Sequence, residues 1–179
     1  MNATPPAPAL ADGVPLYDPA SGLLSRAAVL EALGRTLSMA ARLQHPVTVL
    51  FIEIDGHEHH RAQAPERADT MERTLARQLV GRMRVHDVLA HWARGQFVAV
   101  LPDADVASAL VLAEDLRTLA QTCASPGVTV SIGIHGRTPS ATQALHGLAA
   151  DMVVGAQRAL EATVAEGPNR LAIEPAPQA

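Results

Sequence analysis

The chain has 179 residues, 14 of them basic and 18 acidic, and its formal net charge of -4 argues against a general binder of nucleic-acid backbones. Apolar residues make up 48% and aromatic residues 2% of the chain, so we expect one domain with an aliphatic core. The single cysteine, Cys123, excludes an internal disulfide and a paired-cysteine metal site, and fits a cytoplasmic location. The apolar runs are too short to span a membrane.

Both ends of the chain are predicted to be disordered. Residues 1–15 are rich in alanine and proline and show no hydrophobic period, as expected of a leader or linker. Residues 174–179 have the same character. The ordered domain is therefore predicted to cover residues 16–173.

Between these ends, hydrophobic patterns of the helical and the extended period alternate. Apolar residues three and four positions apart predict helices, and β-branched apolar runs predict strands. The helices are expected at residues 25–44, 65–83, 106–121 and from 142 or 148 to 165. The strands are expected at residues 47–54, 88–92, 97–101, 128–134 and 171–173.

This order of elements predicts the fold class. Helices and strands interleave, which is typical of an α/β or α+β domain with a central sheet covered by helices. Within it, strand, helix, strand, strand, helix, strand is the ferredoxin-like order. Residues 93–96 are expected to join the two short strands as a hairpin. Such an order predicts a common fold and leaves the function open.

Five segments of the chain resemble, in order, the GGDEF family of diguanylate cyclases between Tyr17 and Ile173. They are YDPASGLLSR at 17–26, VTVLFIEID at 47–55, RVHDVLAHWARGQFVAVLP at 84–102, VTVSIGI at 128–134 and GPNRL at 167–171. The resemblance implies the nucleotide-cyclase-like fold of that family, with a mainly antiparallel sheet flanked by helices. It also implies a role in bacterial cyclic di-GMP signalling.

The positions that would hold metal ions depart from the family pattern. The family places two divalent cations between a carboxylate at the end of the first strand and an acid in the hairpin, because phosphoryl transfer needs charge neutralisation. Glu53 and Asp55 stand at the strand end as vestigial acids. Gly95 replaces the hairpin acid, and the neutral Gln96 replaces the acid after it. In place of the signature GGDEF stand Ala93, Arg94, Gly95, Gln96 and Phe97.

The positions that would hold the triphosphate and the guanine base also depart. The family's phosphate-binding lysine and arginine correspond to Val164 and Pro168, which cannot donate to a phosphate. The chain contains no lysine at all. Asp69 matches the family's guanine-binding aspartate, but the matching asparagine is missing among residues 59–63. The resemblance therefore implies a degenerate domain that is not an enzyme and carries no cofactor or metal.

One binding motif of the family is retained. Arg84 and Asp87 match the RxxD site, where an arginine and an aspartate hold the guanine and phosphate groups of cyclic di-GMP. The alternative is that the two side chains form only a surface ion pair three residues apart. Asp115 stands where the family often supplies a further arginine, and Asp115 would repel a phosphate.

Two other features have ordinary structural explanations. The histidine-rich stretch 57–60 is expected to be an exposed, solvated loop rather than a metal site, because it has no third ligand partner. Trp92 is expected to pack in the core rather than to stack on a base.

The sequence thus predicts a catalytically inactive regulatory module that binds a partner protein, a second copy of itself, or cyclic di-GMP at Arg84 and Asp87. The first alternative is a structural dimerisation domain without a ligand. The second is a residual enzyme that binds GTP with one metal ion at Glu53 and Asp55.

Overall fold

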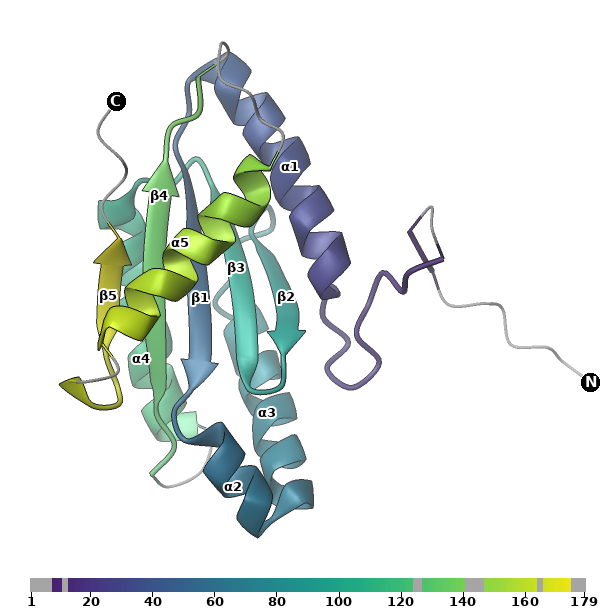
Figure 1. Cartoon of the computed structure of the whole chain (residues 1–179), viewed down its shortest axis with the longest axis vertical. Helices are drawn as coiled ribbons and strands as arrows, with labels where there is room; N and C mark the ends of the chain where they lie inside the picture. Colours follow the sequence, from purple (N-terminus) through teal and green to yellow (C-terminus); the bar gives the residue numbers. More distant parts are fainter. Residues whose placement is uncertain (1–7, 11–12, 124–126, 141–146, 164–165, 175–179) are drawn as a thin grey trace, which may run out of the picture.

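The computed structural model of the chain describes residues 8–10, 13–123, 127–140, 147–163 and 166–174, and its centre is a five-stranded sheet (Figure 1). The strand order is β2-β3-β1-β4-β5. All neighbouring strands are antiparallel except β4 and β5, which are parallel. The strands are β1 (Val47–Ile54), β2 (Val88–Ala93), β3 (Gln96–Pro102), β4 (Val130–Arg137) and β5 (Leu171–Glu174).

The topology confirms the predicted ferredoxin-like order. The first four strands lie in the order β2-β3-β1-β4, and β1 pairs with β3 and β4 over its length. Because β1 is covered on both faces, its side chains are apolar almost without interruption. Glu53, the last residue but one of β1, breaks that run. This end of β1 lies at the bottom of Figure 1, where the β2–β3 hairpin also turns.

Helices cover both faces of the sheet (Figure 1). On one face α1 (Arg26–Leu43) and α5 (Leu148–Thr163) enclose a core that includes Leu33, Leu37 and Phe51. On the other face α3 (Pro65–Val80) and α4 (Val106–Cys123) enclose a second core around Leu50, Ile52 and Leu75. A short helix, α2 (His57–Gln63), follows β1 at the lower end of the sheet.

Local signals place the helix ends as expected. The Ser25 hydroxyl accepts a hydrogen bond from the Ala28 N–H at 3.2 Å and caps α1. Pro65 occupies the first turn of α3, where a missing N–H costs nothing. Met71, Leu75 and Leu79 lie four residues apart and face the core that α3 covers.

The helix α5 lies unusually close to β4 at one point. A Cβ atom on Gly133 of β4 would overlap the carbonyl oxygen of Ala156 in α5. Glycine is therefore required there by space rather than by backbone conformation. This contact fixes α5 against the sheet, and the chain then returns along the edge as β5.

Element ends differ from the expected ones by a few residues. The helix α3 ends at Val80 instead of residue 83, and β4 begins at Val130 instead of residue 128. Glu174, assigned to the disordered tail by composition, is the last residue of β5. In the leader, Ala9 pairs with Pro15 through an isolated bridge. Residues 1–7 and 175–179 of the predicted leader and tail lie outside the described residues. Within the described part, no helix has the length and apolarity needed to cross a bilayer.

Candidate functional site

The signature positions form a tight turn at the end of the β2–β3 hairpin. Ala93 pairs with Gln96, so only Arg94 and Gly95 lie in the turn, which is two residues shorter than the predicted connection. Gly95 has a φ of 70°, a left-handed conformation that favours glycine. Phe97 is fully buried in the core. Trp92 is half-buried and its ring meets Phe51 edge-on at 6.2 Å, which agrees with the packing role predicted for it.

Gly95 is packed directly against the ring of His57. A Cβ atom built on Gly95 would lie 2.5 Å from Cγ and 2.8 Å from Nδ1 of His57. The space that an acidic side chain would need at this position is therefore occupied by an imidazole. The carboxylate that the resemblance places here is absent from the sequence, and the structure leaves no volume for it.

The two vestigial acids at the end of β1 already have hydrogen-bond partners. The side-chain amide of Gln96 donates to Glu53 Oε2 at 2.8 Å across the β1–β3 pair. Asp55 accepts three hydrogen bonds, from the hydroxyls of Thr129 at 2.6 Å and Ser131 at 2.7 Å and from the Asn169 N–H at 2.8 Å. Asp55 thus ties β1 to β4 and to the turn before β5.

The described residues contain no group of three or more histidine, cysteine or acidic side chains arranged to hold a metal ion. A divalent cation at Glu53 and Asp55 would have to replace the Gln96 amide and the donors on Asp55, and it would find no further carboxylate at Gly95. Magnesium needs near-octahedral oxygen coordination, so these residues do not fit the pair of cations that the family implies.

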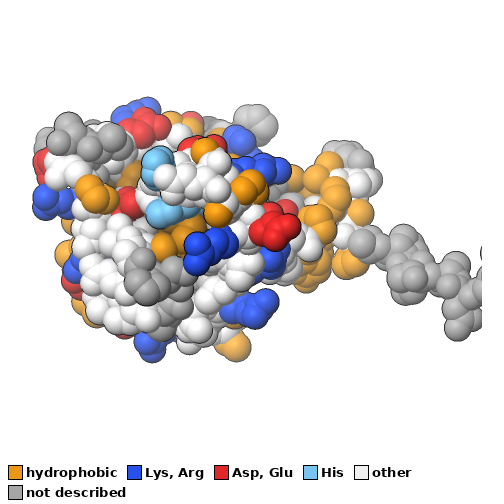
Figure 2. Space-filling view, turned by 90° about the horizontal axis from the view of Figure 1, so that it is seen from below, with side chains coloured by type: hydrophobic (Ala, Val, Ile, Leu, Met, Phe, Trp, Pro, Cys, Tyr) orange, Lys and Arg blue, Asp and Glu red, His pale blue; other side chains and the backbone are white. Residues whose placement is uncertain are grey.

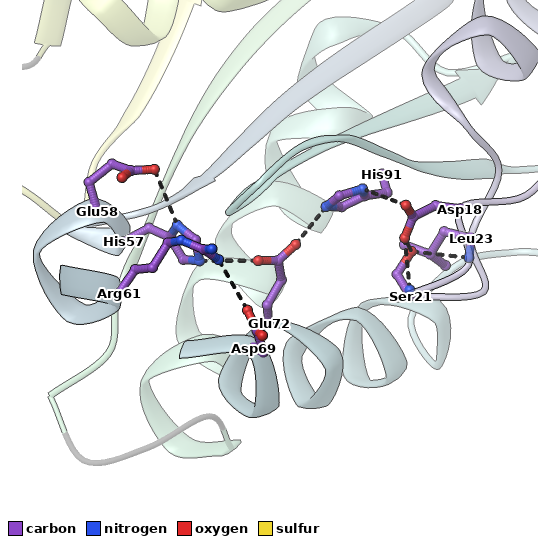
Figure 3. Close-up of polar contacts among 9 residues, drawn as sticks. All are labelled: Asp18, Ser21, Leu23, His57, Glu58, Arg61, Asp69, Glu72 and His91. Atoms are coloured by element: carbon purple, nitrogen blue, oxygen red, sulfur yellow. Dashed lines mark hydrogen bonds and ion pairs between the residues drawn. The ribbon is translucent and has the colours of Figure 1, made fainter. Parts of the chain in front are cut away.

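The positions predicted for phosphate and base binding offer few groups that could bind a nucleotide. Pro168 is exposed in the turn before β5, and Val164 lies outside the described residues. Asp69 forms an ion pair with Arg61, with Nη1 and Oδ1 3.3 Å apart, so its carboxylate is already partnered (Figure 3).

The Arg84–Asp87 motif forms a turn between α3 and β2. The Asp87 carboxylate accepts a hydrogen bond from the backbone N–H of Arg84 at 2.7 Å, and the Asp87 N–H donates to the Arg84 carbonyl at 3.0 Å. The surface ion pair considered for these two residues is not formed. The exposed Arg84 guanidinium has no hydrogen bond or ion pair within the described part of the chain, so it is free to meet a ligand.

Arg84 and Asp87 border a small cavity against α4, which Arg82 and Ser108 also line. Asp115, expected to repel a phosphate, lies on α4 and pairs with Arg82 at 3.3 Å. Because this pairing offsets its charge, Asp115 disfavours an anion less than its position in the sequence suggested.

A second polar cluster lies behind the hairpin turn and was not predicted from the sequence. It is a chain of alternating acids and imidazoles that crosses three elements and the loop before α1 (Figure 3). We call it the polar relay, and its members are Asp18, His57, Glu72 and His91.

Glu72 of α3 is the centre of the polar relay. Its Oε1 lies 2.5 Å from His91 Nε2, and its Oε2 lies 3.1 Å from His57 Nε2 (Figure 3). The His57 contact has ion-pair distance but lacks the alignment of a hydrogen bond. Burial acts to raise the pKa of Glu72. The hydrogen bond from His91, the Gly95 N–H and the nearby imidazoles nevertheless lower that pKa overall.

His91 connects the relay to the loop before α1. Its Nδ1 lies 3.4 Å from Asp18 Oδ2, while Asp18 Oδ1 accepts hydrogen bonds from the backbone and hydroxyl of Ser21. The hydrogen bond to Glu72 raises the pKa of His91, against the effect of burial, and Asp18 raises it further. Burial acts to raise the pKa of Asp18, but Ser21 and His91 lower it overall.

The histidine-rich stretch was predicted wrongly as an exposed loop. It forms the first turn of α2, and the His57 side chain is only 4% exposed. The lower face of the molecule, seen in Figure 2, shows histidine, basic and acidic side chains interspersed rather than one patch of a single charge. A signal for the relay was present in the sequence. His91 lies two residues after Leu89 and therefore on the same, inward face of its strand. Glu72 directly follows Met71 on the buried side of α3.

Comparison with known proteins gives a consistent family match. The family model "Diguanylate cyclase, GGDEF domain" matches residues 15–170. No curated protein matches the chain.

Several solved structures share the fold. The GGDEF domain of DgcB from Caulobacter crescentus, in complex with c-di-GMP, has a TM-score of 0.79 and 18% identity over 89% of this chain and 95% of that one. The FimX GGDEF domain from Pseudomonas aeruginosa has a TM-score of 0.77 and 21% identity over 88% of this chain and 99% of that one. The diguanylate cyclase SiaD from Pseudomonas aeruginosa, solved with its activator SiaC, has a TM-score of 0.77 and 19% identity over 88% of this chain and 61% of that one.

Proposed function

Because the chain belongs to the GGDEF domain family, we propose that it acts in cyclic di-GMP signalling by binding and does not synthesise the dinucleotide. The observation that carries the proposal is the packing of Gly95 against His57. The sequence has no acid at this position, and the imidazole occupies the space that an acid would need. Glu53 is held by Gln96, and Asp55 by three donors. Phosphoryl transfer without bound metal ions leaves the charge of the reacting phosphate unneutralised.

The proposed ligand site is the Arg84–Asp87 turn. Arg84 has an exposed guanidinium, whose planar fork suits a guanine edge or a phosphate. The Asp87 carboxylate is bonded to a backbone N–H through Oδ2, which fixes its orientation. The DgcB domain was solved in complex with c-di-GMP, which supports this dinucleotide as the ligand to test first.

A protein partner is the second candidate for the same face. Val85, directly after Arg84, is fully exposed. An arginine beside an exposed apolar side chain is a common combination at protein contact sites. The complex of SiaD with its activator SiaC supports a protein ligand for a domain of this fold.

Calorimetry with cyclic di-GMP, and separately with GTP plus Mg²⁺, tests the proposal. We expect heat with cyclic di-GMP from the native chain and no heat from Arg84→Ala. Arg42→Ala, an exposed arginine at the end of α1, is the matched control and keeps the binding. If neither ligand gives heat, cyclic di-GMP is not the ligand, and a protein partner or a scaffold role remains. Turnover of GTP to the cyclic dinucleotide, followed by chromatography, would refute the proposal.

A further inference from the structure

The loop before α1 is attached to the sheet by His91 in two ways. The His91 backbone N–H donates to the Leu24 carbonyl at 2.9 Å, and the His91 ring faces the Asp18 carboxylate. We call residues 18–23 the entry loop. The loop closes on itself through the Gly22 N–H, which donates to the Asp18 carbonyl, and its buried Leu23 packs on the core. Asp18 lies at the base of the loop, where its N–H donates to the Leu23 carbonyl at 2.8 Å, and its carboxylate is the side-chain attachment of the loop to His91.

The His91 ring lies between two carboxylates, one at each nitrogen. Glu72 Oε1 lies 2.5 Å from Nε2, and Asp18 Oδ2 lies 3.4 Å from Nδ1 (Figure 3). An imidazolium has two N–H groups and can donate to both carboxylates. A neutral imidazole has one N–H, so its other nitrogen points a lone pair at a negatively charged oxygen. Both carboxylate contacts of the ring are favourable only when His91 is protonated.

The two sides of the ring are not equivalent. The Glu72 contact is shorter, and the Glu72 side chain is 11% exposed against 21% for Asp18. A neutral His91 therefore keeps its proton on Nε2, where loss of the hydrogen bond would leave a more buried carboxylate unpaired. The repulsion then falls between Nδ1 and Asp18, which is the contact to the entry loop.

We propose that the polar relay is a pH-responsive latch, in which protonated His91 holds the entry loop on the sheet and loss of that proton releases the loop from His91. Leu24 remains held by the backbone bond to His91, so the release is confined to residues 18–23. The raised pKa of His91 and the lowered pKa values of Asp18 and Glu72 agree with a charged ring between two charged acids.

Water and protons can reach the ring. His91, Asp18 and Arg94 line both a groove of about 650 Å³ beside α1 and a cavity of about 250 Å³ beside α3. Loosening the entry loop would therefore change the walls of both spaces.

The other charged groups around His91 come from every neighbouring element. The smaller cavity is lined by Asp69 and Arg73 of α3, and the groove by Arg26 of α1. Arg94 in the turn borders both spaces, and His57 of α2 contacts Glu72. From β3 the ring meets Phe97 at 5.9 Å. Of these groups, Glu72 and Asp18 lie within ion-pair distance of the ring, and both favour its protonated form.

The sign of the effect follows from linkage. A histidine whose pKa is raised on folding adds stability that is fully present below its unfolded value of about 6.5 and is lost as pH rises through the folded value. Each unit of that increase changes the latch equilibrium about tenfold. The entry loop is therefore closed in acid and opens as the solution becomes alkaline.

Nuclear magnetic resonance on the full chain tests the latch. We expect the His91 ring to titrate with a midpoint above about 6.5, and the backbone amides of Ser21, Gly22 and Leu23 to shift with the same midpoint. Hydrogen exchange, corrected for the intrinsic rate at each pH, should show a loss of protection in residues 18–23 at high pH. His86→Gln, an exposed histidine before β2, is the matched control and keeps the full response.

Two variants separate a latch from a merely structural histidine. His91→Gln removes the pH response of the entry loop and exposes its amides at every pH. Asp18→Asn keeps the Oδ1 acceptor for Ser21 but removes the charge that faces His91. In Asp18→Asn the His91 midpoint should fall while the fold persists, and the loop should no longer follow the ring. A His91 midpoint at or below about 6.5, or loop amides that ignore the His91 titration in the native chain, would overturn the proposal.

Discussion

Gly95→Ala adds one methyl group at the point where the turn meets His57. The backbone at Gly95 has a φ of 70°, and a left-handed residue other than glycine costs roughly 1–2 kcal/mol. The new Cβ would also lie 2.5 Å from His57 Cγ, and overpacking of this kind typically costs about 1–3 kcal/mol. The two effects together predict a loss of roughly 2–5 kcal/mol in the free energy of unfolding. For a chain of this size that corresponds to a fall in Tm of roughly 4–20 °C.

Gly22→Ala separates the two costs. Gly22 has a φ of 73°, but a Cβ there would meet no atom within 4 Å, so Gly22→Ala measures the backbone cost alone. Urea unfolding of both variants gives the difference, which is the overlap with His57. Adding His57→Ala to Gly95→Ala should recover most of that difference in a double-mutant cycle. Equal losses in the two glycine variants would show that Gly95 has room for a side chain, and the packing argument against a hairpin acid would fail.

Three further outcomes follow from other contacts. Asp55→Ala leaves Thr129, Ser131 and the Asn169 N–H without their acceptor. Urea unfolding should show a loss of roughly 2–4 kcal/mol in the free energy of unfolding, and Asp55→Asn should show about half of that loss. Gly133→Ala should displace α5 and lower Tm by more than Gly95→Ala, because the overlapping atom is backbone. Burial lowers the pKa of His135, so its contribution to stability is present above the unfolded value of about 6.5 and is lost as pH falls; a His135→Phe variant should lose less stability in acid than the native chain.

Much of the fold could be predicted because its signals are local. The strand β1 is apolar on both faces, and the stripe of Met71, Leu75 and Leu79 has the helical period, so strand and helix types were clear. The last turns were less certain. The expected end of α3 at residue 83 is three residues beyond the observed end at Val80, because Met83 packs on the core without continuing the helix.

The site was predictable only where it resembled a known motif. The signature positions and the Arg84–Asp87 turn have fixed spacing along the chain, so they were located by residue number. The polar relay joins residues 73 positions apart at its extremes, Asp18 and His91, and its distances depend on how the entry loop, α2 and α3 pack on the hairpin. Periodicity indicates that His91 and Glu72 face inward, but it does not show which residues they contact. The stretch at His57 has the polar composition of a loop, and that composition does not reveal which of its imidazoles is buried.

The glycine at position 95 and the polar relay are two aspects of one arrangement. His57 can contact Glu72 at 3.1 Å only because position 95 has no side chain, and the Gly95 N–H helps to lower the pKa of Glu72. An acid at position 95 would have to expel His57 from a place where its side chain is 4% exposed, and would bring a second carboxylate towards Glu72. Two carboxylates that close repel each other unless a cation or a proton lies between them. The turn is therefore packed against an imidazole at the position where the family signature has an acid, and under the proposed function we expect no turnover of GTP even when Mg²⁺ is in excess.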